Sequence, residues 1–216
     1  MLLYIVGEIM IIEKIECGAL AQNTYFVCDA HAAVLIDASS KVDEVKKLID
    51  IYSVPLKAIF ITHAHFDHIL HLDELISEFK CPVYVHDEGK DMLVDENKNL
   101  SFIDMPFIVK NVDKVLSFSS DAAIEGIFDK PIYTLYTPGH SLDSVCYKID
   151  DIVFTGDTLF LGTVGRTDMF GGSATEQKHS LIKLSDFIKG TNRLCAGHGE
   201  DYTPEEAQET IEYYSK

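Results

Sequence analysis

The stretch that decides the fold is Ala58-Ile59-Phe60-Ile61-Thr62-His63-Ala64-His65-Phe66-Asp67-His68. Its first four residues are apolar and predict a β-strand. The residues that follow place three histidines and one aspartate within six positions. A loop at the end of a rigid strand is free to present ligands. Because side chains alternate between two faces of an extended chain, we expect His63, His65 and Asp67 to point one way and His68 another.

Imidazole and carboxylate groups in this run indicate a metal site. Such ligands suit zinc, iron or manganese better than calcium or magnesium. The competing interpretation is a solvated loop that is polar by chance. It requires three of the chain's nine histidines to fall together in this one run. A short loop with ligands on two faces can serve two adjacent metal positions.

Length and charge limit the function classes. The chain has 216 residues, of which 47% are apolar, and a formal net charge of −17. This length is enough for a buried core, so we interpret residues 1–216 as a single domain. The 35 acidic residues outnumber the 18 basic ones. Since phosphate binding is driven by Lys and Arg, we expect neither nucleic acid nor an acidic membrane as a partner.

Cysteine usage and the amino terminus bear on the compartment. The five cysteines are Cys17, Cys28, Cys81, Cys146 and Cys195. Their odd number and the lack of a C-x-x-C pair favour free thiols and a cytoplasmic location. The apolar amino terminus is too short to span a membrane and lacks the basic region of a signal peptide. We hypothesise that Met10 is the natural start and that residues 1–9 are an upstream extension.

Apolar patterns predict strands and helices along the chain, without a linker between halves. The predicted strands cover residues 10–16, 24–28, 33–37, 57–61, 81–85, 131–136, 144–149, 152–155 and 193–196. The predicted helices cover residues 42–52, 70–79, 174–189 and 204–214. Residues 87–115 predict a short helix and a loop suited to form one wall of a cleft. Strands followed by helices in each half indicate the α+β class, as an αββα sandwich of two mixed β-sheets with outer helices.

Three further strand ends carry a metal-binding side chain in a tight turn. The turns are Thr137-Pro138-Gly139-His140, Gly156-Asp157-Thr158 and Ala196-Gly197-His198-Gly199. Pro and Gly permit sharp turns, and the two oxygens of Asp157 can bridge two cations. One such turn is common loop chemistry. Four strand ends that each carry a ligand together indicate a metal centre.

The order of these motifs resembles the metallo-β-lactamase fold superfamily over residues 11 to about 203. Two segments within it, Gly156-Asp157-Thr158-Leu159-Phe160 and Gly165-Arg166-Thr167-Asp168, resemble the glyoxalase II-like hydrolases. The resemblance implies an αββα fold and two divalent metal ions, with zinc preferred over iron or manganese. It implies the ligands His63, His65 and His140 for one metal and Asp67, His68 and His198 for the other, with Asp157 bridging.

The resemblance also suggests two supporting residues. Asp37 matches a buried acid that orients the metal loop in the family, although a simple turn residue closing a strand is an equal alternative. Arg166 aligns with a basic residue that contacts the thiol carrier, and its planar fork suits a carboxylate. The alternative for Arg166 is a surface ion pair with Asp168.

Three features depart from the family pattern. Residues 141–144 read Ser-Leu-Asp-Ser where family members often have Thr-Pro-Gly-Ser after the histidine. Leu70-His71 stands where two glycines commonly follow the metal loop. Neither change removes a ligand. True glyoxalase II holds glutathione with a carboxy-terminal helical domain, and since 18 residues follow His198 here, we expect that domain to be absent.

The expected activity is hydrolysis of a small thioester of the hydroxyacyl-thiol type. Hydroxide formed from a metal-bound water would attack the carbonyl, with Asp67 orienting it. The alternatives are a phosphodiesterase or nuclease, which the net charge disfavours, a lactamase, and a mononuclear-iron sulfur dioxygenase. Many lactamases carry Cys where Asp157 stands and are secreted. Metal stoichiometry distinguishes the dioxygenase, which has one metal ion, from the expected hydrolase, which has two. The sequence leaves the acyl group, the thiol carrier and the oligomeric state open.

Overall fold

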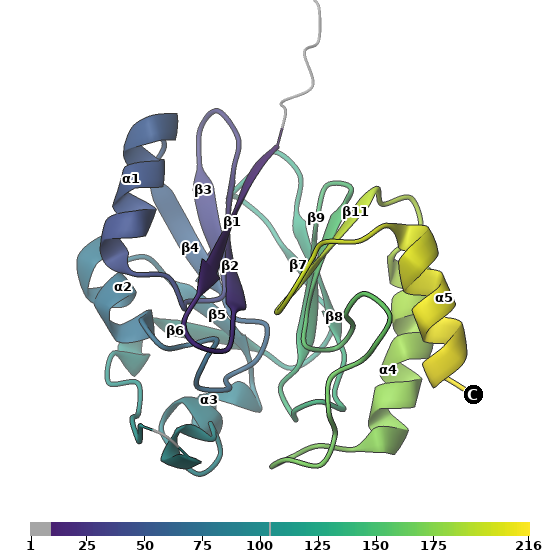
Figure 1. The fold of residues 1–216 in the computed structure, drawn as a ribbon. Coiled ribbons are helices and arrows are strands. Elements are labelled where there is room, and N and C mark those ends of the chain that lie inside the picture. The colour runs from purple at the N-terminus through teal and green to yellow at the C-terminus, as the bar shows by residue number, and fades with distance from the viewer. Residues whose placement is uncertain (1–9, 104) are drawn as a thin grey trace, which may run out of the picture.

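The computed structural model describes residues 10–103 and 105–216. Two mixed β-sheets pack face to face, and helices cover the outer face of each sheet (Figure 1). The predicted αββα sandwich is confirmed. The proposed amino-terminal extension, residues 1–9, lies outside the described residues.

The first sheet holds the amino-terminal half of the chain. Its strands, in spatial order, are β1 (Ile11–Cys17), β2 (Gln22–Cys28), β3 (Ala33–Ile36), β4 (Leu56–Phe60), β5 (Val83–His86) and β6 (Val115–Phe118). β1 to β3 pair antiparallel, and β3 to β6 pair parallel. Parallel neighbours need a crossover, which α1 (Val42–Tyr52) and α2 (Leu72–Phe79) provide. The carboxyl ends of β3 and β4 therefore meet at one edge.

The second sheet holds the carboxy-terminal half. Its strands, in spatial order, are β11 (Arg193–Ala196), β10 (Ile152–Gly156), β9 (Val145–Ile149), β8 (Ile132–Tyr136) and β7 (Ala123–Ile124). All neighbours are antiparallel except β10 and β11. α4 (Ala174–Phe187) makes the crossover between these two strands, and α5 (Pro204–Tyr214) packs beside it on the outer face (Figure 1).

Apolar side chains fill three layers. On β3, Leu35 packs toward the outer helices, whereas its neighbour Val34 lies between the sheets. Between the sheets, the ring of Phe60 lies 5.3 Å from the ring of Tyr147 across the interface. Leu181 of α4 belongs to the third layer, under the helices of the second sheet. The central strands are buried on both faces, which explains why they read as continuous apolar runs.

Residues 87–124 differ most from the sequence prediction. The predicted short helix is α3 (Gly89–Leu93), and two 3₁₀ turns, Ser101–Ile103 and Val112–Lys114, follow it. The short strands β6 and β7 were not predicted, because they are edge strands with half-exposed residues and a weak apolar pattern. Elsewhere, the helix predicted at 70–79 begins at Leu72.

The described residues can be compared with two expectations from the sequence, free cysteines and no membrane-spanning segment. All five cysteines are free, as predicted, and all five are buried. No helix in residues 10–103 and 105–216 combines the length and apolar character needed to cross a membrane.

Candidate metal centre

The metal loop, residues 62–68, follows β4 and is held by Asp37. The Oδ1 atom of Asp37 accepts a hydrogen bond from the Thr62 amide at 2.7 Å, and its Oδ2 atom accepts one from the Thr62 hydroxyl at 2.9 Å. Asp37 follows β3 in the left-handed region, with φ of 62°, which ends the predicted strand one residue early. The buried Asp37 carboxylate thus ties together the ends of two parallel strands.

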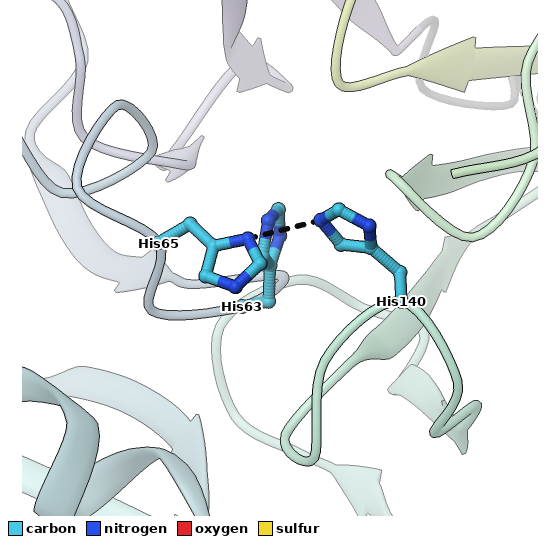
Figure 2. A group of neighbouring side chains, drawn as sticks. All are labelled: His63, His65 and His140. Carbon is cyan, nitrogen blue, oxygen red and sulfur yellow. Dashed lines mark hydrogen bonds between the residues drawn. The ribbon is translucent and has the colours of Figure 1, made fainter. Parts of the chain in front are cut away.

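Three histidines form the first ligand group. His63 and His65 come from the metal loop and His140 from the turn after β8, and their rings converge from opposite sides (Figure 2). The His65 Nδ1 and His140 Nε2 atoms are 2.9 Å apart. His140 Nδ1 donates to the Arg166 carbonyl at 2.8 Å, because a carbonyl can only accept. In the neutral imidazole, the form that binds a metal, the His140 Nε2 atom therefore has its lone pair directed at the group.

His63 is oriented by its neighbour in the loop. The Thr62 hydroxyl donates to Asp37, so it accepts from His63 Nδ1 at 3.1 Å. The His63 Nε2 atom is then unprotonated. It is buried and has no hydrogen-bond partner among the described residues.

Asp67, His68 and His198 form the second ligand group. His68 Nδ1 donates to Asp37 Oδ2 at 2.8 Å, and His198 Nδ1 donates to the Leu20 carbonyl at 2.9 Å. Their two Nε2 atoms face each other 3.3 Å apart. Asp67 Oδ2 lies 3.2 Å from His198 Nε2. With both Nδ1 atoms donating, the neutral form of each imidazole would present its Nε2 lone pair to a metal ion beside the Asp67 carboxylate.

Asp157 lies between the two groups. Its Oδ1 atom is 3.4 Å from His68 Nε2, and its Oδ2 atom is 3.5 Å from His140 Nε2. The Oδ2 atom is also 3.6 Å from His198 Nε2. The carboxylate therefore lies within reach of both groups, which is the bridging position that the family resemblance implies. Gly197 makes room for it, because a Cβ atom there would lie 2.2 Å from Asp157 Oδ1.

The donor set fits a pair of divalent metal ions. Facing lone pairs repel one another unless a cation or a proton lies between them. The buried atoms His63 Nε2, His65 Nε2 and Asp157 Oδ1 lack hydrogen-bond partners among the described residues, and unpaired buried polar atoms are costly. Four of the five ligand histidines, all except His65, donate Nδ1 to an acceptor behind the ring, which is the usual arrangement of a metal-binding histidine.

Electrostatics of the metal-free protein differ between the groups. Burial, reinforced by the neighbouring histidines, lowers the pKa of His63 well below its usual range. Burial, reinforced by His140, lowers the pKa of His65 to about 3. Both imidazoles are therefore neutral at physiological pH and available as ligands.

The second group attracts positive charge. Burial opposes protonation of His68, but the carboxylates of Asp67, Asp37 and Asp157 outweigh it and raise its pKa. Burial likewise opposes ionisation of Asp157, yet the neighbouring His68 lowers the pKa of that carboxyl. Without a metal, protons take the place of a cation in this group.

The structure brings all seven predicted ligand side chains together, but their grouping differs from strand alternation. Alternation placed Asp67 with His63 and His65, whereas Asp67 lies with His68 and His198. The reason is that β4 ends at Phe60, so the loop turns instead of continuing as an extended strand.

Arg166 lies at the rim of the site. Its guanidinium is exposed and makes two hydrogen bonds to Asp168, at 2.7 and 2.8 Å. The surface ion pair is therefore present, and the substrate contact stays a prediction. The main chain of Arg166 has a separate role in holding His140, which residue type alone could not indicate.

Asp143 is a site residue that sequence reasoning missed. Its side chain is buried, its Oδ2 atom accepts from the Ala64 amide at 2.7 Å, and its Oδ1 atom accepts from the Ser141 hydroxyl at 2.6 Å. It therefore joins the metal loop to the His140 turn. The signal was present in the departure at residues 141–144, where an acid replaces the usual glycine.

A cavity of about 320 Å³ opens above the metal-binding side chains. Its floor includes His65, Asp67, His140 and Asp157, and Arg166 lies on one side. Leu100 and Ile103 line it, so residues from the 87–115 segment do form part of a cleft wall, as predicted. A larger hollow of about 560 Å³ beside residues 105–110 includes none of the metal-binding side chains.

Comparison with known proteins agrees with this geometry. The family model described as the metallo-beta-lactamase superfamily matches residues 17–198. The probable metallo-hydrolase YqgX of Bacillus subtilis is 31% identical over 195 residues, which cover 87% of this chain and 90% of that protein. This chain belongs to the metallo-β-lactamase superfamily.

Two solved structures are similar over nearly their whole length. The B3 metallo-β-lactamase BLEG-1 superposes with a TM-score of 0.83 at 28% identity, covering 95% of this chain and all of that one. The protein TTHA1623 in a di-iron-bound form superposes with a TM-score of 0.77 at 26% identity, covering 92% of this chain and 98% of that one.

Proposed function

We propose that this protein is a glyoxalase II-like hydrolase that cleaves small thioesters with two divalent metal ions, preferably zinc. One observation carries the proposal. Asp157 lies close to one histidine of each ligand group, His63 and His68, and the site opens into a cavity large enough for a small substrate. The imidazole and carboxylate donors suit zinc or iron, and the di-iron form of TTHA1623 supports a binuclear site.

The residues around the cavity have separate tasks. Divalent metal ions bound by these ligands supply a Lewis acid for the carbonyl oxygen and lower the pKa of a coordinated water. Burial opposes ionisation of Asp67, but His68 and His198 lower its pKa, so it is a carboxylate at neutral pH. As it also faces the cavity, Asp67 can accept a hydrogen bond from the attacking water and orient it.

The leaving group decides between acyl substrates. A thiolate leaves without a proton, whereas the amine of an opened lactam must be protonated. Apart from Arg166, the cavity lining beyond the metal-binding side chains is apolar or glycine. These residues offer no general acid. The lining therefore favours a thioester over an amide.

β-Lactam hydrolysis is the second candidate. The observation that favours it is the superposition on BLEG-1 with a TM-score of 0.83. The lack of a proton donor in the cavity lining makes it the weaker proposal for this chain.

A substrate panel with metal analysis tests both candidates. Protein loaded with zinc is assayed on lactoyl and acetyl thioesters of glutathione, coenzyme A and N-acetylcysteamine, on a chromogenic cephalosporin, and on a phosphodiester. We expect thioester cleavage that a chelator abolishes and zinc restores, with two metal ions per chain. Faster cleavage of the cephalosporin or phosphodiester than of every thioester would show the proposal to be wrong, as would one iron per chain with oxygen consumption.

A further inference from the structure

We infer that the substrate carries an aliphatic chain beside its scissile carbonyl, and that this chain binds to an apolar wall of the cavity. The inference rests on the proposed thioester hydrolysis and specifies its substrate class. The apolar wall consists of Leu20, Phe66, Leu100, Ile103, Phe160 and Met169.

The apolar wall is assembled from separate parts of the chain. Leu20 comes from the turn between β1 and β2, Phe66 from the metal loop, and Ile103 from the segment after α3. Phe160 and Met169 come from the loop between β10 and α4. These segments, which are far apart in sequence, place six apolar side chains around the metal-binding floor, with Arg166 as the one charged neighbour beyond the floor itself.

Part of this wall is exposed to water. Leu20 is 54% exposed and Ile103 is 65% exposed. A ligand that covers apolar surface gains free energy roughly in proportion to the area it removes from water. Met169 is unbranched and can adapt to chains of different shape. The wall thus provides binding free energy for an apolar group.

Charge argues against an anionic carrier as the main source of affinity. Among the residues that line the cavity, Arg166 is the only Lys or Arg, and Asp168 already pairs with it. The chain as a whole carries a formal net charge of −17. A multiply charged carrier would meet repulsion at long range, and the only cationic side chain of the cavity lining that could bind it is already paired.

Polar substituents on the bound chain are also disfavoured. A hydroxyl placed against the six side chains of the apolar wall would lose water without gaining a protein partner from them. The favoured ligand is therefore a plain aliphatic chain. It can belong to the acyl group or to the thiol, because both flank the carbonyl.

Two substrate series test the inference and separate these sources. The first series extends the acyl group from acetyl to butyryl and hexanoyl on N-acetylcysteamine. The second keeps the acetyl group and extends the thiol from ethanethiol to hexanethiol. We expect kcat/KM of the zinc-loaded protein to rise roughly two- to fourfold per methylene in one series. That series identifies which side of the substrate binds to the wall.

Flat or falling values in both series would overturn the inference and leave thioester hydrolysis standing. Absence of hydrolysis for every thioester would instead contradict the proposed function, and the inference with it.

Variants connect the chain-length effect to the wall. Ile103→Ala and Met169→Ala should each reduce the ratio of the long-chain to the short-chain kcat/KM roughly three- to tenfold. Ile51→Ala is the matched control, because Ile51 is 68% exposed on α1 and does not line the cavity.

A binding measurement provides a readout without turnover. Calorimetry with hexanoate and acetate should show a preference for hexanoate that Ile103→Ala weakens and Ile51→Ala does not. If both Ile103→Ala and Met169→Ala kept the full preference for hexanoate over acetate, the assignment of the apolar wall as the binding site of the aliphatic chain would be overturned.

Discussion

Hydrogen-bond acceptors behind the imidazole rings orient most of the ligand histidines. His140 and His198 donate to main-chain carbonyls, of Arg166 and Leu20, whereas His68 donates to the Asp37 carboxylate. A substitution cannot remove a carbonyl. The acceptors behind His68 and His63 are side chains, of Asp37 and Thr62, and mutagenesis can reach them directly.

Asp37→Asn should lower metal affinity about 10- to 100-fold, the usual cost of losing a partner behind a metal-binding histidine. The amide retains one acceptor atom, so it cannot accept all three hydrogen bonds that the Thr62 amide, the Thr62 hydroxyl and His68 now donate to the two carboxylate oxygens. Affinity is measured by competition with a chromophoric chelator. Asp168→Asn, in an exposed ion pair at the rim, is the control. Equal affinity of Asp37→Asn and wild type would contradict the role.

Asp143 should make stability depend on pH. Burial raises the pKa of Asp143 from 3.8 to about 6, partly offset by its hydrogen bonds from Ser141 and Ala64. The folded state therefore favours the protonated acid. The resulting contribution to stability is fully present below about pH 4 and is lost as the pH rises through 6. A rise of this size corresponds to about 3 kcal/mol.

The comparison with Asp143→Asn isolates this titration. The free energy of unfolding of the variant minus that of wild type, measured by denaturant titration of metal-free protein, should increase between pH 4 and pH 7. Other titrating groups cancel in the difference. A difference that does not change with pH would show that Asp143 titrates normally.

At the scale of elements, α4 supports the turn that carries His140. Gly139 O accepts from the Ser173 amide at 2.8 Å, and Pro138 O accepts from the Ser180 hydroxyl at 2.7 Å. The turn approaches the helix so closely that a Cβ atom on Gly139 would lie 2.4 Å from the Cα atom of Gln177. The helix therefore fixes the position of the ligand.

Gly139→Ala should separate the turn from α4. We expect a loss of stability of about 1–3 kcal/mol from overpacking, together with weaker metal binding. Gly126→Ala is the control, since Gly126 has a φ of 82° but nothing within 4 Å of an added Cβ. Thermal unfolding and metal content are measured for both. Equal losses of stability and of bound metal in Gly139→Ala and Gly126→Ala would mean that backbone strain alone, and not contact with α4, causes the loss.

Sequence predicted the elements that have strong local signals. The helix predicted at 204–214 matches α5, whose start at Thr203-Pro204 has a capping box and a proline in the first turn. The strand predicted at 193–196 matches β11. β6 and β7 escaped prediction because edge pairing, rather than composition, determines them.

The candidate site shows a similar division. Side-chain type was enough to select the histidines and aspartates that converge. It could not identify Leu20 and Arg166 as the residues that orient His198 and His140. Their main-chain carbonyls accept the hydrogen bonds from these histidines, and every residue has such a carbonyl. Nor could spacing alone assign Asp67 to its group, since that depends on where β4 ends.

At the scale of the whole molecule, the candidate metal centre joins the two sheets. The metal loop belongs to the first sheet, whereas His140, Asp157 and His198 follow strands of the second. Asn23 of β2 adds a direct link between the sheets, because its main-chain amide donates to the Gly197 carbonyl at 2.7 Å. Bound metal would therefore strengthen the contact between halves.

Metal removal should lower the melting temperature of the whole chain. Ligands that bind only the folded state stabilise it by about 4 kcal/mol at a thousand times their dissociation constant. Calorimetry before and after exhaustive chelation, with metal content checked by elemental analysis, measures the loss. Zinc readdition should reverse it. An unchanged melting temperature in verified metal-free protein would mean that the sheets associate without help from the site.

The ligands that meet in the centre are far apart in sequence. His65 and His140 are 75 residues apart, and His68 and His198 are 130 apart. Both ligand groups are complete only after the two halves have folded and packed. Because contacts between residues so distant in sequence form late in folding, we expect the complete site to form after the folding transition state. Zinc should then slow unfolding and leave the refolding rate unchanged. Stopped-flow kinetics that showed faster refolding with zinc would mean that the metal loop binds metal early.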